Sequence, residues 1–426
     1  MRLWITIWVA GALFHATASP ANDEVGLIEV DGSISPATAG YISRGIQVAA
    51  SRNQTCVIIR LNTPGGLVKS TERIVDDFYS SRVPIVVYVA PAPASAASAG
   101  ALITMAADIA VMAPHTRIGA AHPVNINQTG SAEKVDDTMQ KKQENDMLAF
   151  VETIADKRHR NVEWAKAAVR DSVSATAETA LDENVIDFIA RDVSDLLGQI
   201  DGREVHGKTL RTANATVMSI PMTVREKVLK LFLQPEVMFV FTLIVIYGII
   251  GELSSPGAIL PGVAGAIALI IVLCQMAILP INLAGVSLIA LALVLFVIDI
   301  YAPTHGVLTG GGIIAFFLGA LMLFNRDPAF RLSLSYIIPG TLFTALFFLF
   351  VIGAGLRAQL LPKRVGRETM MGKVVPAMVR IDATGGRVFI EGEIWNAVSD
   401  VAIEANQSVE VVSVDGLTLR VKPRAA

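Results

Sequence analysis

The stretch from residue 235 to residue 356 is almost free of charged side chains, and it limits the possible folds of this chain more than any other feature. Of the 426 residues, 53% are hydrophobic and only 17% are charged. An ordinary soluble protein has about 25% charged residues. Because a helix needs roughly 20 apolar residues to cross the hydrocarbon of a bilayer, the stretch predicts a membrane domain over residues 235–357.

The apolar stretch divides into five candidate membrane helices. They cover residues 236–252, 257–278, 281–300, 307–325 and 334–356. The first is short and is followed by a Pro-Gly break at 256–257, so a re-entrant hairpin is the alternative there. The segment before the first helix, 201–234, reads as a linker that ends in a short basic amphipathic stretch, able to lie on a membrane surface.

The N-terminus has the pattern of a secretory signal. Arg2 precedes an apolar run over residues 3–14, and Ala16 and Ala18 give the small-x-small pattern of a cleavage site. We therefore expect a signal peptide at 1–19, with a retained anchor helix as the alternative. Either reading places the following domain outside the cytoplasm.

Basic residues after the last apolar segment predict the opposite side for the C-terminus. Arg357, Lys363, Arg364 and Arg367 cluster there, and such clusters favour the cytoplasmic face. An exported N-terminal domain and a cytoplasmic C-terminal domain require an odd number of crossings, which agrees with five. The predicted location is the inner (plasma) membrane of a bacterial-type cell.

The two polar regions predict two different soluble folds. Residues 20–200 alternate apolar strand patterns with helical ones, which indicates an α/β domain with a largely parallel sheet. Residues 358–426 contain short strands separated by glycines, typical of a small all-β barrel such as an OB-fold. With a net charge of −3 and few aromatic side chains in the barrel, no nucleic-acid partner is expected.

Two small-residue motifs in the α/β region suggest acyl-transfer chemistry. Thr63-Pro64-Gly65-Gly66 follows an apolar strand, and backbone N–H groups of consecutive glycines can approach and stabilise an oxyanion. Ser98 stands in the run Ala94-Ser95-Ala96-Ala97-Ser98-Ala99-Gly100 between a strand and a helix. A serine there lies at a helix N-terminus, where the dipole favours developing negative charge. Each motif alone is also compatible with an ordinary turn or tight packing.

A lysine could serve as the base for such a serine if burial or a positive neighbour lowered its pKa. Spacing alone does not distinguish Lys142 from Lys141 or Lys134. The cysteines, Cys56 and Cys274, have no metal-ligand companions, so neither a metal nor a cofactor is expected.

Taken in order, these motifs resemble the long-form NfeD family, whose members resemble stomatin-operon partner proteases and, more distantly, the Clp/crotonase-type proteases. The resemblance rests on Gly65-Gly66, the segment around Ser98, residues 118–123 (Ile-Gly-Ala-Ala-His-Pro), and Lys142 with Asn145. It covers the protease, membrane and C-terminal regions. It implies a Clp/crotonase-like fold for residues 20–200 and an OB-fold-like NfeD domain for 358–426.

The resemblance also implies a serine endopeptidase with a Ser–Lys dyad, carried here by Ser98 and Lys142. The oxyanion hole would be the backbone N–H groups of Gly66 and Ala99. The family cleaves apolar segments of a stomatin (SPFH-type) membrane protein, so we expect such a partner or substrate, a lipid bilayer and a homo-oligomer.

Two alternatives stay open. One keeps the fold but uses a Ser-His-Asp triad, with His122 as base and Asp171 as acid. The other is a non-catalytic scaffold that organises stomatin-like oligomers, because crotonase-type folds host many functions.

Overall fold

A computed structural model describes residues 23–121, 137–254, 259–302, 304, 306–324, 328–360 and 370–424. The predicted signal peptide at 1–19 and the basic residues Lys363, Arg364 and Arg367 lie outside these residues. The chain forms two compact units, Met1–Phe347 and Phe348–Ala426, and each is described by itself.

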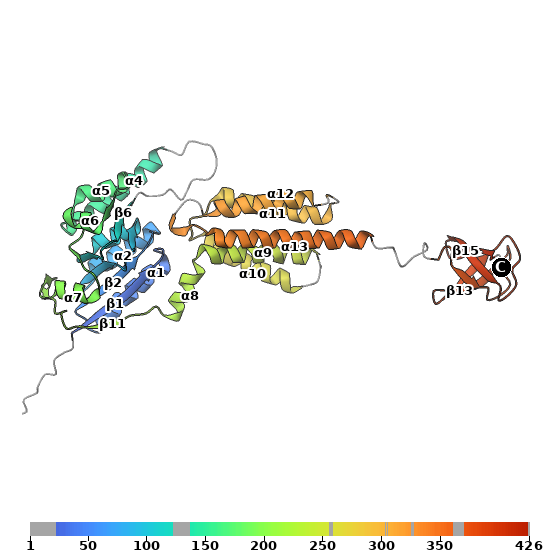
Figure 1. Ribbon diagram of the computed structural model, residues 1–426, viewed down its shortest axis with the longest axis horizontal. Helices are drawn as coiled ribbons and strands as arrows, with labels where there is room; N and C mark the ends of the chain where they lie inside the picture. Colours follow the sequence, from blue (N-terminus) through green and yellow to red (C-terminus); the bar gives the residue numbers. More distant parts are fainter. Residues whose placement is uncertain are drawn as a thin grey trace, which may run out of the picture. The chain divides into compact units, whose positions relative to one another are not determined.

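The N-terminal domain is built on a six-stranded, fully parallel sheet (Figure 1). Its strands, in spatial order, are β11 (Thr216–Ser219), β1 (Glu24–Asp31), β2 (Cys56–Asn62), β3 (Ile85–Val89), β5 (Ile109–Met112) and β8 (Phe188–Ile189). The central strands β2 and β3 are apolar on both faces because both faces are covered, as is usual for parallel sheets.

Helices on the two faces bury two separate clusters of apolar side chains. Most helices contribute to the larger cluster: α1 (Pro36–Ser51), α2 (Val68–Ser80), α3 (Ala99–Ala106), α4 (Asp137–Lys157), α5 (Val162–Arg170) and α6 (Ala177–Asp182). The smaller cluster lies under α7 (Val193–Ile200). The predicted α/β fold is confirmed.

A second, three-stranded sheet lies beyond the strand ends of the large one. It contains β4 (Ser95–Ala97), β6 (Arg117–Gly119) and β7 (Ser174–Thr176). An isolated bridge from Thr63 to Ala96 joins it to the residues that follow β2. The small sheet therefore brings the glycine motif and the serine motif of the sequence to one place.

The segment 201–222, expected to be a linker, instead belongs to the N-terminal domain. It contains the short hairpin of β9 (Glu204–Val205) and β10 (Lys208–Thr209), and strand β11 pairs with β1 at the sheet edge. The segment is polar and still forms a strand, because β11 is a short edge strand that pairs only with β1, and such strands commonly carry polar side chains.

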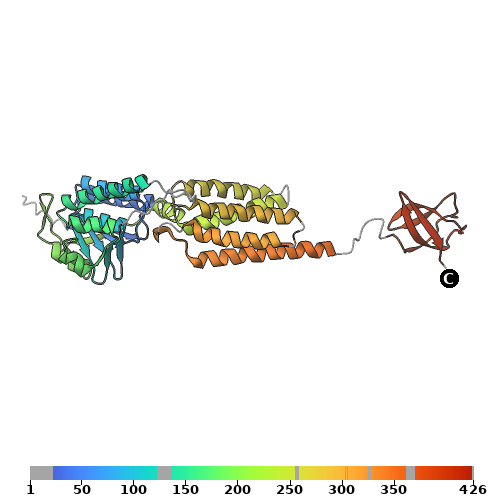
Figure 2. The same cartoon turned by 90° about the horizontal axis from the view of Figure 1, so that it is seen from above.

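Five apolar helices follow the short helix α8 (Val224–Phe232) and lie side by side in both views (Figures 1 and 2). They are α9 (Pro235–Ser254), α10 (Ile259–Met276), α11 (Leu283–Tyr301), α12 (Val307–Leu323) and α13 (Leu334–Leu360). Among the described residues, α9 and α10 contain spans long and apolar enough to cross a membrane, and the other three contain shorter apolar stretches. The helices match the five predicted segments, while the number of crossings stays a prediction.

The C-terminal unit is a nearly closed barrel of five strands. These are β12 (Val374–Pro376), β13 (Gly386–Ile390), β14 (Glu393–Val398), β15 (Ser408–Asp415) and β16 (Thr418–Pro423), in the order β12-β15-β16-β14-β13. A bridge from Ala377 to Val388 connects the two outer strands. One parallel pair, β14 with β16, stands among antiparallel ones. This is the predicted OB-like arrangement.

Candidate active site

Ser98 occupies a strained position at the junction between β4 and α3. Its backbone has φ +50° and ψ −115°, a region that residues other than glycine seldom adopt. It is the N-cap of α3, yet its side chain makes no capping hydrogen bond. The half-buried Oγ is therefore left available at the positive end of the helix dipole, as a nucleophile requires.

The glycine motif lies directly against Ser98. A Cβ added to Gly65 would stand 2.8 Å from Ser98 Cβ and 3.3 Å from its Oγ, and Gly65 has φ +125°. A Cβ on Gly66 would be 2.2 Å from the carbonyl oxygen of Ile34. The loop thus requires glycine at both positions, one for closeness to Ser98 and the other for closeness to Ile34.

Hydrogen bonds in this loop leave the predicted oxyanion donors unused. The Gly65 N–H donates to Thr63 Oγ1 over 3.1 Å, and its carbonyl accepts from the Ile34 N–H over 2.8 Å. Among the described residues, the N–H groups of Gly66 and Ala99 donate no hydrogen bond. Two free N–H groups beside a serine are what an oxyanion hole needs.

Two interactions that the sequence analysis did not single out hold the serine segment in place. The Ser98 N–H donates to the Gly119 carbonyl over 3.0 Å. The Asn62 amide donates to Asp31 over 3.0 Å and accepts from the Ser95 N–H over 3.0 Å. Gly119 belongs to the segment 118–123 that carries the family resemblance, so the sequence points to it. The contacts of Asn62 are made between strands far apart in the chain, and no local sequence pattern predicts them.

Lys142 is not brought to Ser98 in the structure. It is exposed on the first turns of α4, and its side chain forms no hydrogen bond or ion pair with a described residue. The packed part of α4 starts further along, where Met147 contacts the core and Val151 is buried. The first turns are polar and gain nothing from packing, so the expected burial of Lys142 is not seen here.

Of the two further residues in the alternative triad, the structure describes only Asp171. Asp171 is exposed at the C-cap of α5, and His122 lies outside the described residues. The Ala121 N–H donates to the Ala168 carbonyl over 2.8 Å, so the chain that leads to position 122 passes the end of α5.

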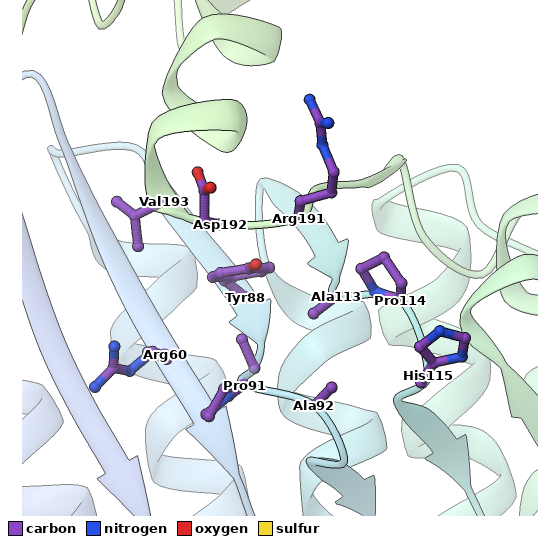
Figure 3. Close-up of a pocket in the computed structure, with 11 residues that line it drawn as sticks. Arg60, Tyr88, Pro91, Ala92, Ala113, Pro114, His115, Arg191, Asp192 and Val193 are labelled. Atoms are coloured by element: carbon purple, nitrogen blue, oxygen red, sulfur yellow. The ribbon is translucent and has the colours of Figure 1, made fainter.

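A pocket of about 360 Å³ lies at the ends of β2, β3 and β5, and Ser98 is not among its lining residues (Figure 3). The Tyr88 ring stands at its centre, with Arg60 and His115 on opposite sides. Burial raises the pKa of Tyr88 to about 12, and its hydroxyl donates to the Ala190 carbonyl over 2.9 Å. Tyr88 therefore has a structural role there.

Known families match almost the whole chain in three consecutive parts. Residues 24–201 match the N-terminal domain of NfeD1b, and residues 236–354 match the NfeD integral membrane domain. Residues 367–423 match the NfeD-like C-terminal, partner-binding domain.

Two relatives are similar over nearly their full lengths. The membrane-bound protease PH1510 of Pyrococcus horikoshii is 31% identical over 96% of this chain and 95% of its own. The membrane protein NfeD1b of Bacillus subtilis is 28% identical over 95% of this chain and 94% of its own.

Solved structures include the N-terminal part of a stomatin-specific membrane protease. A lysine-to-alanine mutant in complex with a substrate peptide is 31% identical, with a TM-score of 0.45, and covers 50% of this chain and 98% of that one. A serine-to-alanine mutant is 32% identical, with a TM-score of 0.44, and covers 48% of this chain and 100% of that one.

The α/β domain presents a strained, half-buried serine and is joined to a block of apolar helices. Together with the similarity of the whole chain to a known protease, these features define a membrane-bound protease. The chain belongs to the NfeD family, as its motifs predicted.

Proposed function

We propose that the N-terminal domain is a serine endopeptidase with a Ser–Lys dyad, in which Ser98 is the nucleophile and Lys142 the general base. The observation that carries this proposal is the conformation of Ser98, with φ +50° and an uncapped side chain at the start of α3. Strain of this kind costs about 1–3 kcal/mol and persists mainly where function needs it.

The chemistry follows from the groups around Ser98. Its Oγ attacks the peptide carbonyl carbon, and the proton passes to the Lys142 amine. The carbonyl oxygen becomes an oxyanion, held by the N–H groups of Gly66 and Ala99. Lys142 returns the proton to the leaving amine as the C–N bond breaks, and water then hydrolyses the acyl-enzyme by the same route.

For this role, the Lys142 amine must come within hydrogen-bonding reach of Ser98 Oγ, about 2.6–3.2 Å. Catalytic hydrogen bonds often form only in the substrate complex. Support comes from the packing of α4 against α3, the helix that Ser98 begins. An approach of the first turns of α4 would therefore bring Lys142 toward Ser98.

The proposed substrate is an apolar segment of a stomatin-like (SPFH-type) membrane protein, cleaved by a homo-oligomer of this chain. A neighbouring structure is described as a stomatin-specific protease, and the C-terminal region matches a partner-binding domain. The side chains beside the serine are all small, namely Ala94, Ala96, Ala97 and Ala99, so no bulky neighbour in the chain covers Ser98. We further propose that the protease domain faces the outside of the cell membrane and the barrel faces the cytoplasm.

A second candidate keeps Ser98 but uses His122 and Asp171. It is favoured by the hydrogen bond from Ala121 to Ala168, which leads the chain past the end of the helix that Asp171 caps. The third candidate, a scaffold for stomatin-like oligomers without catalysis, predicts no reactive serine.

The test is labelling of the full-length protein in detergent with a fluorophosphonate probe. We expect labelling of the wild type and of Ser95→Ala, and none of Ser98→Ala. Cleavage of an apolar peptide should follow the same order. Retained labelling and cleavage in Ser98→Ala would refute the assignment, and absence of both in the wild type would favour the scaffold.

A further inference from the structure

The outward face of α8 is apolar, although the helix stands outside the apolar bundle. Val224, Val228 and Leu231 are spaced by four and three residues and therefore share one face. They are 78%, 58% and 55% exposed. A surface helix of a soluble domain has the reverse arrangement, with its apolar stripe turned inward. We therefore expect this apolar face to contact something other than water.

The inward face of α8 is polar and is fixed to the N-terminal domain. Glu226 accepts two hydrogen bonds from the Arg44 guanidinium on α1, over 2.7 and 2.9 Å. Lys230 Nζ donates to the Asp31 carbonyl over 2.7 Å. Thr223 and Glu226 form a capping box that fixes the helix start. The apolar face is thus held outward by specific contacts and cannot simply rotate inward.

The end of α8 adjoins the membrane helices. α8 ends at Phe232 and α9 begins at Pro235. The Phe232 carbonyl accepts a hydrogen bond from Gln275, a fully buried side chain of α10. Because the chain enters the apolar bundle within three residues, α8 must lie near the level of the lipid headgroups.

Two basic side chains flank the apolar face. Arg225 and Lys227 are exposed, and neither forms an ion pair with a described residue. An apolar stripe with basic residues beside it is typical of helices that lie in the surface of an anionic bilayer. Basic residues near such a surface are attracted to the anionic headgroups.

We propose that α8 is an interfacial helix: Val224, Val228 and Leu231 insert among the lipids, and Arg225 and Lys227 bind anionic headgroups. Through Arg44 and Glu226, the helix holds the N-terminal domain in a fixed orientation on the bilayer. This inference does not depend on the proposed dyad, since it concerns where the domain is held and not how it cleaves.

The test measures lipid contact in the full-length protein, reconstituted in nanodiscs of phosphatidylcholine with phosphatidylglycerol. Cys56 and Cys274 are replaced by alanine, and Val228→Cys or Leu229→Cys carries a fluorophore. Neighbouring positions differ by about 100° around a helix, so Leu229→Cys is a control on another face. We expect shallow doxyl-labelled lipids to quench the probe at position 228 at least about twofold more strongly than at 229.

The same measurement tests the role of Arg225 and Lys227, and it distinguishes lipid from a second protein chain at the apolar face of α8. Replacing phosphatidylglycerol by phosphatidylcholine should weaken quenching at position 228, and Arg225→Gln with Lys227→Gln should remove that difference. Equal quenching at 228 and 229, or none at either, would overturn the proposal. Efficient cross-linking between position 228 of two copies, without lipid quenching, would also overturn it. That result would mean that a second copy of the chain, and not lipid, contacts the apolar face of α8. Peptide cleavage plays no part in these readouts.

Discussion

Gly65 lies so close to Ser98 that a single methyl group on the glycine would stand 2.8 Å from the Cβ of the serine. Gly65 also has φ +125°, and its neighbour Gly66 carries the proposed oxyanion donor. Closeness to the nucleophile and backbone strain are two separate reasons for glycine at this position, and a matched pair of variants can separate them.

Gly65→Ala should therefore reduce peptide cleavage by about a hundredfold, because an ångström of displacement at a nucleophile costs about that much. Gly32→Ala is the control, since Gly32 has φ +105° but nothing within 4 Å of an added Cβ. Both variants should lose stability through strain, by about 1–3 kcal/mol. Thermal melting and kcat/KM are the measurements. Equal loss of activity in both would mean that strain alone explains the effect.

Lys142→Met should lower kcat by about 10²–10⁴-fold, the usual contribution of a general base. Methionine keeps the length and apolar bulk of the side chain but removes the amine. Lys141→Met and His122→Ala should cost much less. The wild-type rate should rise with pH, because only a neutral amine accepts the serine proton. An inactive His122→Ala beside a nearly normal Lys142→Met would replace the dyad by Ser98, His122 and Asp171.

Acid should loosen α8 from the N-terminal domain. Burial raises the pKa of Glu226, but hydrogen bonds from Arg44 and Thr223 lower it by more, so the net pKa is below the usual value. A lowered folded-state pKa gives stability that is present above about pH 4.3 and is lost as the pH falls through the folded value. The Tm of the wild type should fall over that acid range relative to Glu226→Gln. Parallel curves for the two proteins would contradict this prediction.

The barrel at the C-terminus should be cytoplasmic. Alkaline phosphatase, active only outside the cytoplasm, should stay silent when fused after Ala426, while a fluorescent protein fused there should be bright. The physical reason is the basic cluster that begins at Arg357, which favours the cytoplasmic face. An active phosphatase fusion would indicate an even number of crossings.

Local patterns in the sequence were enough to predict most of the architecture. The apolar runs of β2 and β3, the five apolar helices, and the glycine-punctuated strands of the barrel each follow from periodicity and composition. The NfeD motifs likewise predict the family from the sequence alone, and the family models confirm it.

Only the tertiary structure decided which residues meet. The φ of Ser98, its contact with Gly65 and its hydrogen bond to Gly119 depend on the ends of β2, β4 and β6 meeting, where the bridge from Thr63 to Ala96 joins the end of β2 to the small sheet. The tertiary structure likewise determines that β11 lies beside β1 and that Lys142 is exposed. A sequence pattern records which face of an element is apolar. Packing between distant elements decides what that face contacts, because burial is favourable against any apolar surface and has no direction of its own.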